Sequence, residues 1–203
     1  MDLIISPHVD DEVLGCGGIL NKDHVILHCG LSDGFRHGDT IFSKDFRLQE
    51  FEYIKEAVGC ETRLLDHPVN NYSRNKLIGD FENHINKIKP NKIYIPNPSY
   101  NQDHKEVYDA ALIALRPHDI NFFVKQIVTY EQPQDFWHSG RKSFSPTYFV
   151  PIDIVKKINL YEKMNSQVRG HRSTDHIKTI AKLRGMQCNH DYAEAFEVLR
   201  WME

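Results

Sequence analysis

The strongest constraint on the fold is that short apolar runs alternate with longer segments of helical periodicity through the first half of the chain. This alternation is typical of βαβ units, in which helices pack on both faces of a mainly parallel sheet. Five runs rich in β-branched or aromatic residues are predicted strands, at residues 3–6, 25–29, 62–65, 92–96 and 126–130. The sequence therefore predicts a three-layer α/β/α sandwich with a mostly parallel, Rossmann-like sheet.

Apolar residues three or four positions apart predict the helices between and after these strands. One predicted helix ends at Gly59, another ends before Pro90, and three more lie near residues 106–115, 154–165 and 177–184. No internal repeat or linker divides the chain, so we expect a single domain over residues 1–203.

Composition excludes several classes of protein. With 40% hydrophobic and 26% charged residues, the chain is close to the globular average, which argues against a disordered or coiled-coil protein. The 25 Lys and Arg residues against 28 Asp and Glu residues give a formal net charge of -3. A nucleic acid or an anionic membrane is therefore not an expected partner.

Targeting signals and cysteines point to the cytoplasm. The apolar run at the amino end is too short for a signal peptide, and no run reaches the ~18–20 apolar residues of a membrane span. The four cysteines are far apart and form no Cys-x-x-Cys pair. We therefore expect no membrane span, reduced buried thiols and a cytoplasmic location.

A histidine and three acids follow the first predicted strand, in the segment Ser6-Pro7-His8-Val9-Asp10-Asp11-Glu12. Open α/β sheets bind their ligands at this carboxyl edge. The acids by themselves are explained equally well as caps of the following helix. With the histidine added, the spacing suits chelation of one divalent ion, with an adjacent carboxylate left uncoordinated.

A second polar segment, Pro98-Ser99-Tyr100-Asn101-Gln102-Asp103-His104, follows the fourth predicted strand at the same edge. Taken alone, an Asp-His pair before a helix is more typical of a cap than of a metal site. If His104 meets His8 and Asp11, however, two imidazoles and one carboxylate make the three-ligand set of catalytic zinc. The two loops together predict one Zn²⁺ per chain, and another divalent transition metal fits the same ligands.

Both segments resemble motifs of the PIG-L/LmbE-like family of zinc-dependent N-acetylglucosaminyl deacetylases. The first is similar to the family's His-Pro-Asp-Asp-Glu motif with Val9 in place of proline, and the second is similar to a motif that usually reads His-x-Asp-His. Further similar segments lie at residues 31–34, 47–50 and 191–196. The resemblance covers nearly the whole chain.

This resemblance implies the removal of an acetyl group from an N-acetylglucosamine-type sugar or sugar conjugate, a small-molecule amino-sugar substrate. His8, Asp11 and His104 would be the zinc ligands. Asp10 would be the general base that activates water, because zinc and a nearby carboxylate together deprotonate water near neutral pH. Asp103 would orient or tune its neighbours.

Asn101 departs from the family pattern, because the family usually has a histidine there to stabilise the oxyanion. A neutral amide can donate a hydrogen bond to an oxyanion but carries no charge. Asn101 is therefore a predicted catalytic residue, and the alternative is a metal- and sugar-binding protein with impaired catalysis.

Arg47 is a predicted substrate-binding residue. A cation in the first turn of a helix opposes the helix dipole, which favours recognition of a hydroxyl or phosphate group over a local role. The alternative is an ion pair with Asp45 or Glu50.

Gly15-Cys16-Gly17-Gly18 raises a second, less favoured alternative, a nucleotide-binding or methyltransferase-like domain. The preceding acids would repel a phosphate, which argues against it. Other residues are left open: Arg169 and His171 are candidates for the substrate mouth, and Tyr130, Trp137 and Trp201 are unassigned.

Overall fold

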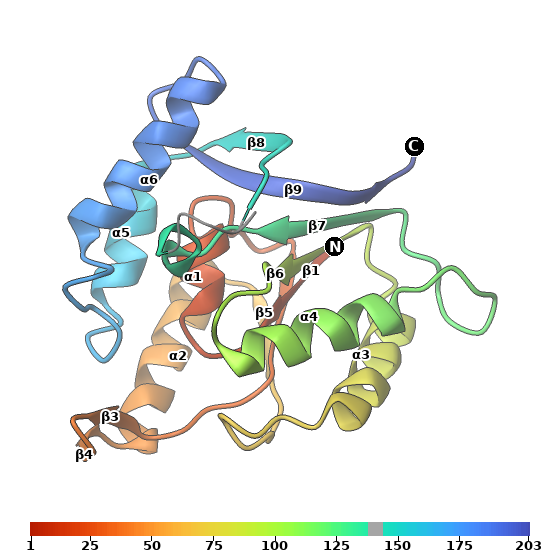
Figure 1. Ribbon diagram of the computed structural model, residues 1–203, viewed down its shortest axis with the longest axis horizontal. Helices are drawn as coiled ribbons and strands as arrows, with labels where there is room; N and C mark the ends of the chain where they lie inside the picture. The colour runs from red at the N-terminus through yellow and green to blue at the C-terminus, as the bar shows by residue number, and fades with distance from the viewer. Residues whose placement is uncertain (138–143) are drawn as a thin grey trace.

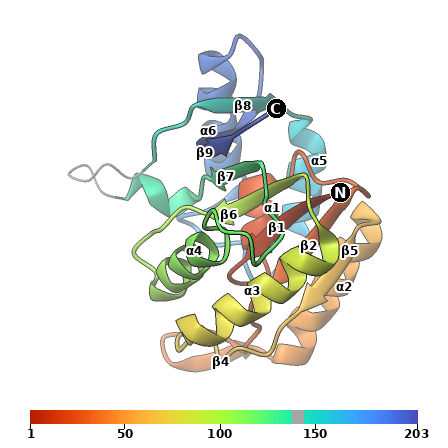
Figure 2. The ribbon, with the colours of Figure 1, turned by 90° about the vertical axis from the view of Figure 1, so that its right-hand side faces the viewer.

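The computed structural model describes residues 1–137 and 144–203 and contains a seven-stranded sheet between two layers of helices (Figures 1 and 2). The strand order is β5-β2-β1-β6-β7-β9-β8. The first five strands in this order are parallel, and β9 is antiparallel to both of its neighbours. The predicted sandwich with a mostly parallel sheet is confirmed. The strands are β1 (Asp2–Ser6), β2 (His24–His28), β5 (Glu61–Leu64), β6 (Lys92–Pro96), β7 (Gln126–Tyr130), β8 (Tyr148–Pro151) and β9 (Ala193–Trp201).

The two helical layers bury opposite faces of the sheet. Successive residues of a strand point to opposite sides, so Leu3 and Ile5 enter one core while Ile4 enters the other. Helices α3 and α4 cover the first face, and α1, α2, α5 and α6 cover the second (Figure 1). The helices are α1 (Asp11–Cys16), α2 (Lys44–Val58), α3 (Arg74–Ile88), α4 (Gln102–Ala114), the 3₁₀ helix η1 (Pro133–Phe136), α5 (Ile154–Glu162) and α6 (Thr174–Gln187).

The structure adds elements to the sequence prediction and shifts the ends of several predicted helices. Strands β8 and β9 extend the sheet, and a hairpin of β3 (Gly34–Arg36) and β4 (Asp39–Phe42) lies outside it; neither was predicted. Helix α4 begins four residues before the predicted start at residue 106. The reason is that Asn101 Oδ1 accepts a hydrogen bond from the backbone N–H of Asp103 at 2.8 Å and caps the helix.

Strand order explains why the two polar segments meet. After β1 the chain builds outward through β2 and β5, and then returns to the other side of β1 at β6. The loops that follow β1 and β6 therefore leave neighbouring parallel strands at the same edge. Such a reversal of direction opens a crevice at the carboxyl ends of the strands.

All four cysteines are free; three are buried, and Cys188, predicted to be buried like the others, is half-buried. In the described parts of the chain, no helix combines the length and the apolar character that a bilayer crossing requires. The cytoplasmic location and the single domain stay predictions.

Candidate metal centre and substrate cavity

The loop after β1 is held by a buried carboxylate. Glu12 Oε2 accepts the backbone N–H of Asp10 at 3.1 Å and lies 3.0 Å from Ser6 Oγ. Asp10 precedes α1, but its side chain makes no capping hydrogen bond. Capping of α1 therefore does not explain the presence of Asp10. Glu12, which the sequence analysis did not single out, positions the loop through its contacts with Ser6 and Asp10.

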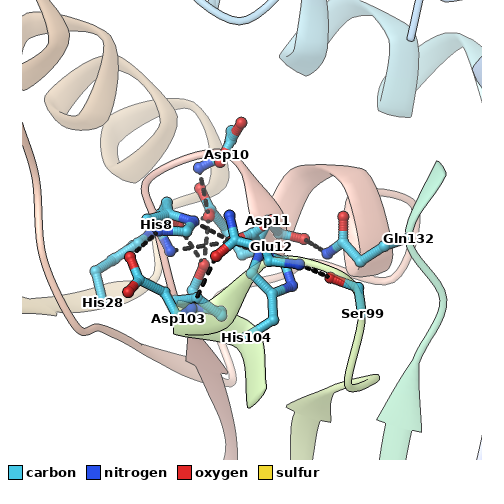
Figure 3. A network of polar contacts seen from close by, with 12 residues as sticks. His8, Asp10, Asp11, Glu12, His28, Ser99, Asp103, His104 and Gln132 are labelled. Carbon is cyan, nitrogen blue, oxygen red and sulfur yellow. Dashed lines mark hydrogen bonds and ion pairs between the residues drawn. The ribbon is translucent and has the colours of Figure 1, made fainter. Parts of the chain in front are cut away.

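His8, Asp11 and His104 converge on one point, as Figure 3 shows. Asp11 Oδ2 lies 3.2 Å from His8 Nδ1 and 3.3 Å from His104 Nε2, and the three ligand atoms lie within 4.8 Å of one another. Tetrahedral zinc with bonds near 2.0 Å separates its ligand atoms by about 3.3 Å. The donor set and its spacing therefore fit a single zinc ion.

Asp103 contacts the outer nitrogen of His8. His8 Nε2 lies 2.9 Å from Asp103 Oδ2, which also accepts the backbone N–H of Asn70 at 2.7 Å. A carboxylate in this position holds a proton on Nε2 and leaves the Nδ1 lone pair for a metal. The contact with Asp103 therefore favours the tautomer of His8 in which Nδ1 is free to bind a metal.

The charged groups of the cluster shift one another's pKa values. Burial by itself would lower the pKa of His8, but the contacts with Asp103 and Asp11 outweigh it and raise the pKa to about 10. Burial pushes the pKa of Asp11 upward, and the imidazoles of His104 and His8 overcome this effect and hold the pKa well below its ordinary value. A metal must displace the proton on His8, so binding releases protons.

Asp10 forms an ion pair that sequence reasoning missed. Arg172 Nη1 donates to Asp10 Oδ2 at 2.8 Å. Burial raises the pKa of Asp10, and the Arg172 guanidinium partly offsets that rise. The Arg172 side chain is itself fixed by Gln167, whose backbone oxygen accepts from Nε at 2.9 Å and whose Oε1 accepts from Nη2 at 2.6 Å. No sequence signal marks this pair, since its members are 162 residues apart.

Gln132 is a further residue that the sequence did not single out. Its side chain is fully buried, and Nε2 donates to the backbone oxygen of Asp11 at 3.1 Å. Its own backbone N–H donates to Asp135 Oδ2 at 2.9 Å. Burial raises the pKa of Asp135, and hydrogen bonds from Gln132 and Asn97 lower it. Burial is the larger effect, and the pKa is raised to about 7.

Arg47 lies in the first turn of α2 and is buried. Its Nη1 donates to the backbone oxygen of Ser32 at 2.7 Å. Glu50, one candidate partner in the alternative reading, instead accepts from the backbone N–H of Ser166 at 2.8 Å and from its hydroxyl. Among the described residues, neither Asp45 nor Glu50 forms an ion pair with Arg47.

A cavity of about 500 Å³ opens over the cluster, a volume typical of small-molecule sites. Every predicted site residue except the buried Asp103 lines it. Arg169, His171 and the exposed Trp137 also line it, with the rings of Trp137 and His171 5.4 Å apart. The lining includes His8, Asp10, Asp11, Ser32, Asp33, Phe35, Arg47, Asn101, His104, Trp137, Gln167, Arg169, His171 and Arg172.

The other aromatic candidates are structural. Tyr130 is fully buried, and its hydroxyl donates to the backbone oxygen of Ile5 at 2.9 Å. Trp201 packs against Tyr148, with ring centroids 5.3 Å apart. Neither Tyr130 nor Trp201 lines the cavity.

The glycines that suggested nucleotide binding serve packing. A Cβ on Gly15 would lie 2.2 Å from Cδ2 of Tyr130, and one on Gly18 would lie 2.6 Å from the Ile152 side chain. Gly15 is part of the buried helix α1. Gly15 lets α1 lie close to Tyr130, and Gly18, just after the helix, lets the backbone lie close to Ile152, so packing accounts for both glycines.

Comparisons with known proteins agree with this geometry. A family model described as PIG-L, GlcNAc-PI de-N-acetylase, matches residues 3–115. No curated protein matches the chain. A similar solved structure is N,N'-diacetylchitobiose deacetylase from Pyrococcus horikoshii, with 20% sequence identity, a TM-score of 0.78 and coverage of 98% of this chain and 83% of that one.

Two further solved structures show that this fold carries more than one reaction. A deacetylase from the teicoplanin biosynthesis pathway shares 18% sequence identity with this chain at a TM-score of 0.74, and the match covers 98% of this chain and 98% of that one. GalB, the 4-carboxy-2-hydroxymuconate hydratase from Pseudomonas putida KT2440, has 19% identity and a TM-score of 0.78 and covers 100% of this chain and 98% of that one. Similarity at this level establishes the fold, and the reaction must be argued from the site.

Proposed function

The chain belongs to the PIG-L family, as its two motifs predicted, and we propose that it is a zinc-dependent deacetylase that hydrolyses the N-acetyl group of an N-acetylglucosamine-type sugar or conjugate. The observation that carries the proposal is the cluster of two imidazoles and one carboxylate within 4.8 Å, beside a further carboxylate in the same cavity. His8, Asp11 and His104 would hold the ion. When bound, zinc supplies the Lewis acid for amide hydrolysis.

Asp10 is the general base in this proposal. Its carboxylate accepts a proton from the attacking water and later returns it to the departing amine nitrogen. The hydrogen bond from Arg172 supports this role, because a neighbouring cation favours the ionised form and fixes the carboxylate orientation.

Asp103 and Asn101 assist from the start of α4. Asp103 keeps the proton on His8 Nε2. Asn101 uses Oδ1 as the helix cap, and this bond orients its amide, whose Nδ2 remains available to donate to the oxyanion that develops on the acetyl group.

Acetate release from a panel of N-acetyl sugars tests the proposal. The panel holds N-acetylglucosamine free, linked to a nucleotide and linked to a lipid, each with zinc-loaded and with chelator-stripped protein. We expect release from at least one sugar, its loss on stripping and its return with zinc. No release from any sugar by protein that carries one zinc per chain would refute the deacetylase.

The second candidate is a metal- and sugar-binding protein with impaired catalysis. The helix cap favours it, because the cap alone explains why an asparagine stands at position 101. Sugar binding without acetate release would identify this candidate.

A further inference from the structure

The segment between β5 and α3, residues 65–73, lies against the loop that follows β1. It continues along the end of β2, because the backbone N–H of Leu65 donates to the oxygen of His28 at 2.9 Å. The N–H of His67 then donates to the oxygen of Cys29 at 3.2 Å. Since β2 is a neighbour of β1 in the sheet, these bonds carry the segment to the edge where β1 ends.

Tyr72, in this segment, contacts the peptide between Pro7 and His8. Its side chain is buried, and its hydroxyl donates to the backbone oxygen of Pro7 at 2.6 Å. Pro7 follows the last residue of β1, so this oxygen lies beyond the hydrogen-bonded ladder of the sheet. The N–H of the same peptide, on His8, donates to Asp11 Oδ2 at 3.0 Å. Because a peptide unit is planar, a hydroxyl that fixes its C=O also fixes the direction of its N–H.

This peptide links Tyr72 to two of the proposed zinc ligands. Asp11 Oδ2 is the oxygen that lies 3.2 Å from His8 Nδ1 and 3.3 Å from His104 Nε2. The rings of Tyr72 and His8 also lie side by side, with centroids 6.0 Å apart. The hydroxyl of Tyr72 therefore acts on the Asp11 carboxylate and on the backbone of His8 through one rigid unit.

Asn70 gives the segment a second contact with the metal centre. Its backbone N–H donates at 2.7 Å to Asp103 Oδ2, the oxygen that lies 2.9 Å from His8 Nε2. Its φ of 69° is in the left-handed region, which asparagine and glycine adopt more readily than β-branched residues. The donor at position 70 therefore depends on the residue type, although it is a backbone group.

The Tyr72 ring packs against a fixed imidazole. The rings of Tyr72 and His67 meet edge to face, with centroids 5.9 Å apart. His67 is buried, and its Nε2 lies 2.9 Å from Asp80 Oδ2 on α3. A Cβ on Gly30 would lie 2.8 Å from the Tyr72 hydroxyl oxygen, so glycine leaves the space that the hydroxyl occupies. These contacts hold the Tyr72 side chain in its place beside Pro7.

We propose that Tyr72 and Asn70 are positioning residues of the metal centre. Tyr72 holds the peptide that orients Asp11. Asn70 holds the carboxylate that contacts His8. This inference rests on the proposed function, because the two residues have this role only if the cluster binds zinc. Removal of a group that orients a metal ligand typically lowers metal affinity or activity by about 10- to 100-fold.

Zinc affinity of the full chain tests the role of Tyr72. Competition with a chromophoric chelator measures Kd, and the visible absorption of protein loaded with Co²⁺ reports the ligand geometry. Tyr72→Phe removes only the hydroxyl and should weaken zinc binding by about 10- to 100-fold and change the Co²⁺ spectrum. Tyr130→Phe is the matched control, because it removes a buried hydroxyl that donates to the backbone oxygen of Ile5, within β1. The control should keep the zinc affinity and the Co²⁺ spectrum of the parent.

A second pair of variants tests position 70, which is exposed, so that folding is little affected. Asn70→Val opposes the left-handed conformation and should weaken zinc binding by about 10-fold or more. Asn70→Gly permits that conformation and should bind zinc like the parent. Both variants lose the side-chain oxygen that accepts from Gln102, so the pair isolates the effect of the backbone. Parent-like zinc affinity in both Tyr72→Phe and Asn70→Val overturns the proposal, as does an equal loss in Tyr72→Phe and Tyr130→Phe.

The positioning role and the deacetylase fail in different ways. Weaker zinc binding in Tyr72→Phe than in Tyr130→Phe, without acetate release by the zinc-loaded parent, would refute the deacetylase and keep the positioning role. Acetate release by the parent, with equal zinc affinity in all the variants, would keep the deacetylase and refute the positioning role.

Discussion

Arg172 donates a hydrogen bond to Asp10 at 2.8 Å and joins the segment before α6 to the loop after β1. The pair links the carboxylate proposed as general base to a side chain that Gln167 holds through two further hydrogen bonds. Asp10 consequently has a fixed orientation although its own loop provides no capping bond. Asp10, the proposed base, therefore pairs with Arg172, whereas Asp11, the next residue and a proposed metal ligand, contacts His8 and His104.

We expect Asp10→Asn to keep its zinc and lose about 10²- to 10⁴-fold in kcat, because an amide accepts no proton from water. Steady-state kinetics and metal analysis measure the two effects separately. Turnover near that of the parent protein would exclude Asp10 as the base.

Arg172→Gln should move the acid limb of the pH profile of kcat/KM to higher pH. Burial already raises the pKa of Asp10, and Arg172 opposes that rise, so its removal raises the pKa further. The base is active when ionised, and a higher pKa therefore removes activity over a wider range on the acid side. Arg116→Gln serves as the control, because Arg116 is an exposed arginine outside the cavity. An unchanged acid limb in Arg172→Gln would contradict the proposed effect of Arg172 on the pKa of Asp10.

Metal content tests the three ligands. His104→Ala should lose the single zinc ion, whereas His190→Ala, which removes an exposed imidazole outside the cluster, should keep it. Zinc at about 100 times its Kd should stabilise the parent protein by about 2.7 kcal/mol and leave the His104 variant unaffected. Elemental analysis and thermal unfolding with and without zinc measure both effects; full zinc occupancy in His104→Ala would place the ion elsewhere.

Substitutions of Asn101 separate its cap from its proposed donor. Asn101→Ala removes both and should cost about 0.5–2 kcal/mol of stability along with a loss of kcat. Asn101→Asp keeps an oxygen for the cap but replaces the amide donor, so it should retain stability and lose about 10²- to 10³-fold in kcat. Chemical denaturation and kinetics check the pair. If Asn101→Asp turns over like the parent, the residue is a cap alone.

Asp135 should make the protein less stable as the pH rises. Its pKa in the folded state is raised from 3.8 to about 7, so the folded state holds a proton that the unfolded chain releases near pH 4. The free energy of unfolding therefore falls between about pH 4 and 7, by at most about 4 kcal/mol for a shift of this size. Asp135→Asn keeps a neutral acceptor for the Gln132 N–H.

Denaturation of the metal-free protein at pH 5 and pH 8 measures this effect. Asp135→Asn should exceed the parent in stability by more at pH 8 than at pH 5. Asp66→Asn, at a fully exposed carboxylate, should show no such difference. The same stability gap at both pH values would show that Asp135 does not titrate in this range.

Local patterns were sufficient for the central sheet. The five predicted strands correspond to β1, β2, β5, β6 and β7, because each is a short apolar run between turn-forming residues. Strand β9 was missed because the six apolar residues among the nine of Ala193–Trp201 do not alternate regularly, and because its partners β7 and β8 lie far away in the sequence. The early start of α4 was missed because one side-chain oxygen, on Asn101, decides it.

The sequence by itself determined the chemical types at the site and the sheet edge that carries them, because polar segments follow β1 and β6 and parallel strands end together. Only the tertiary structure decided the partners of those residues. Asp103 contacts the outer nitrogen of His8 across 95 positions, and Arg172 contacts Asp10 across 162. Side-chain hydrogen bonds act over about 3 Å, so packing rather than spacing along the chain selects them.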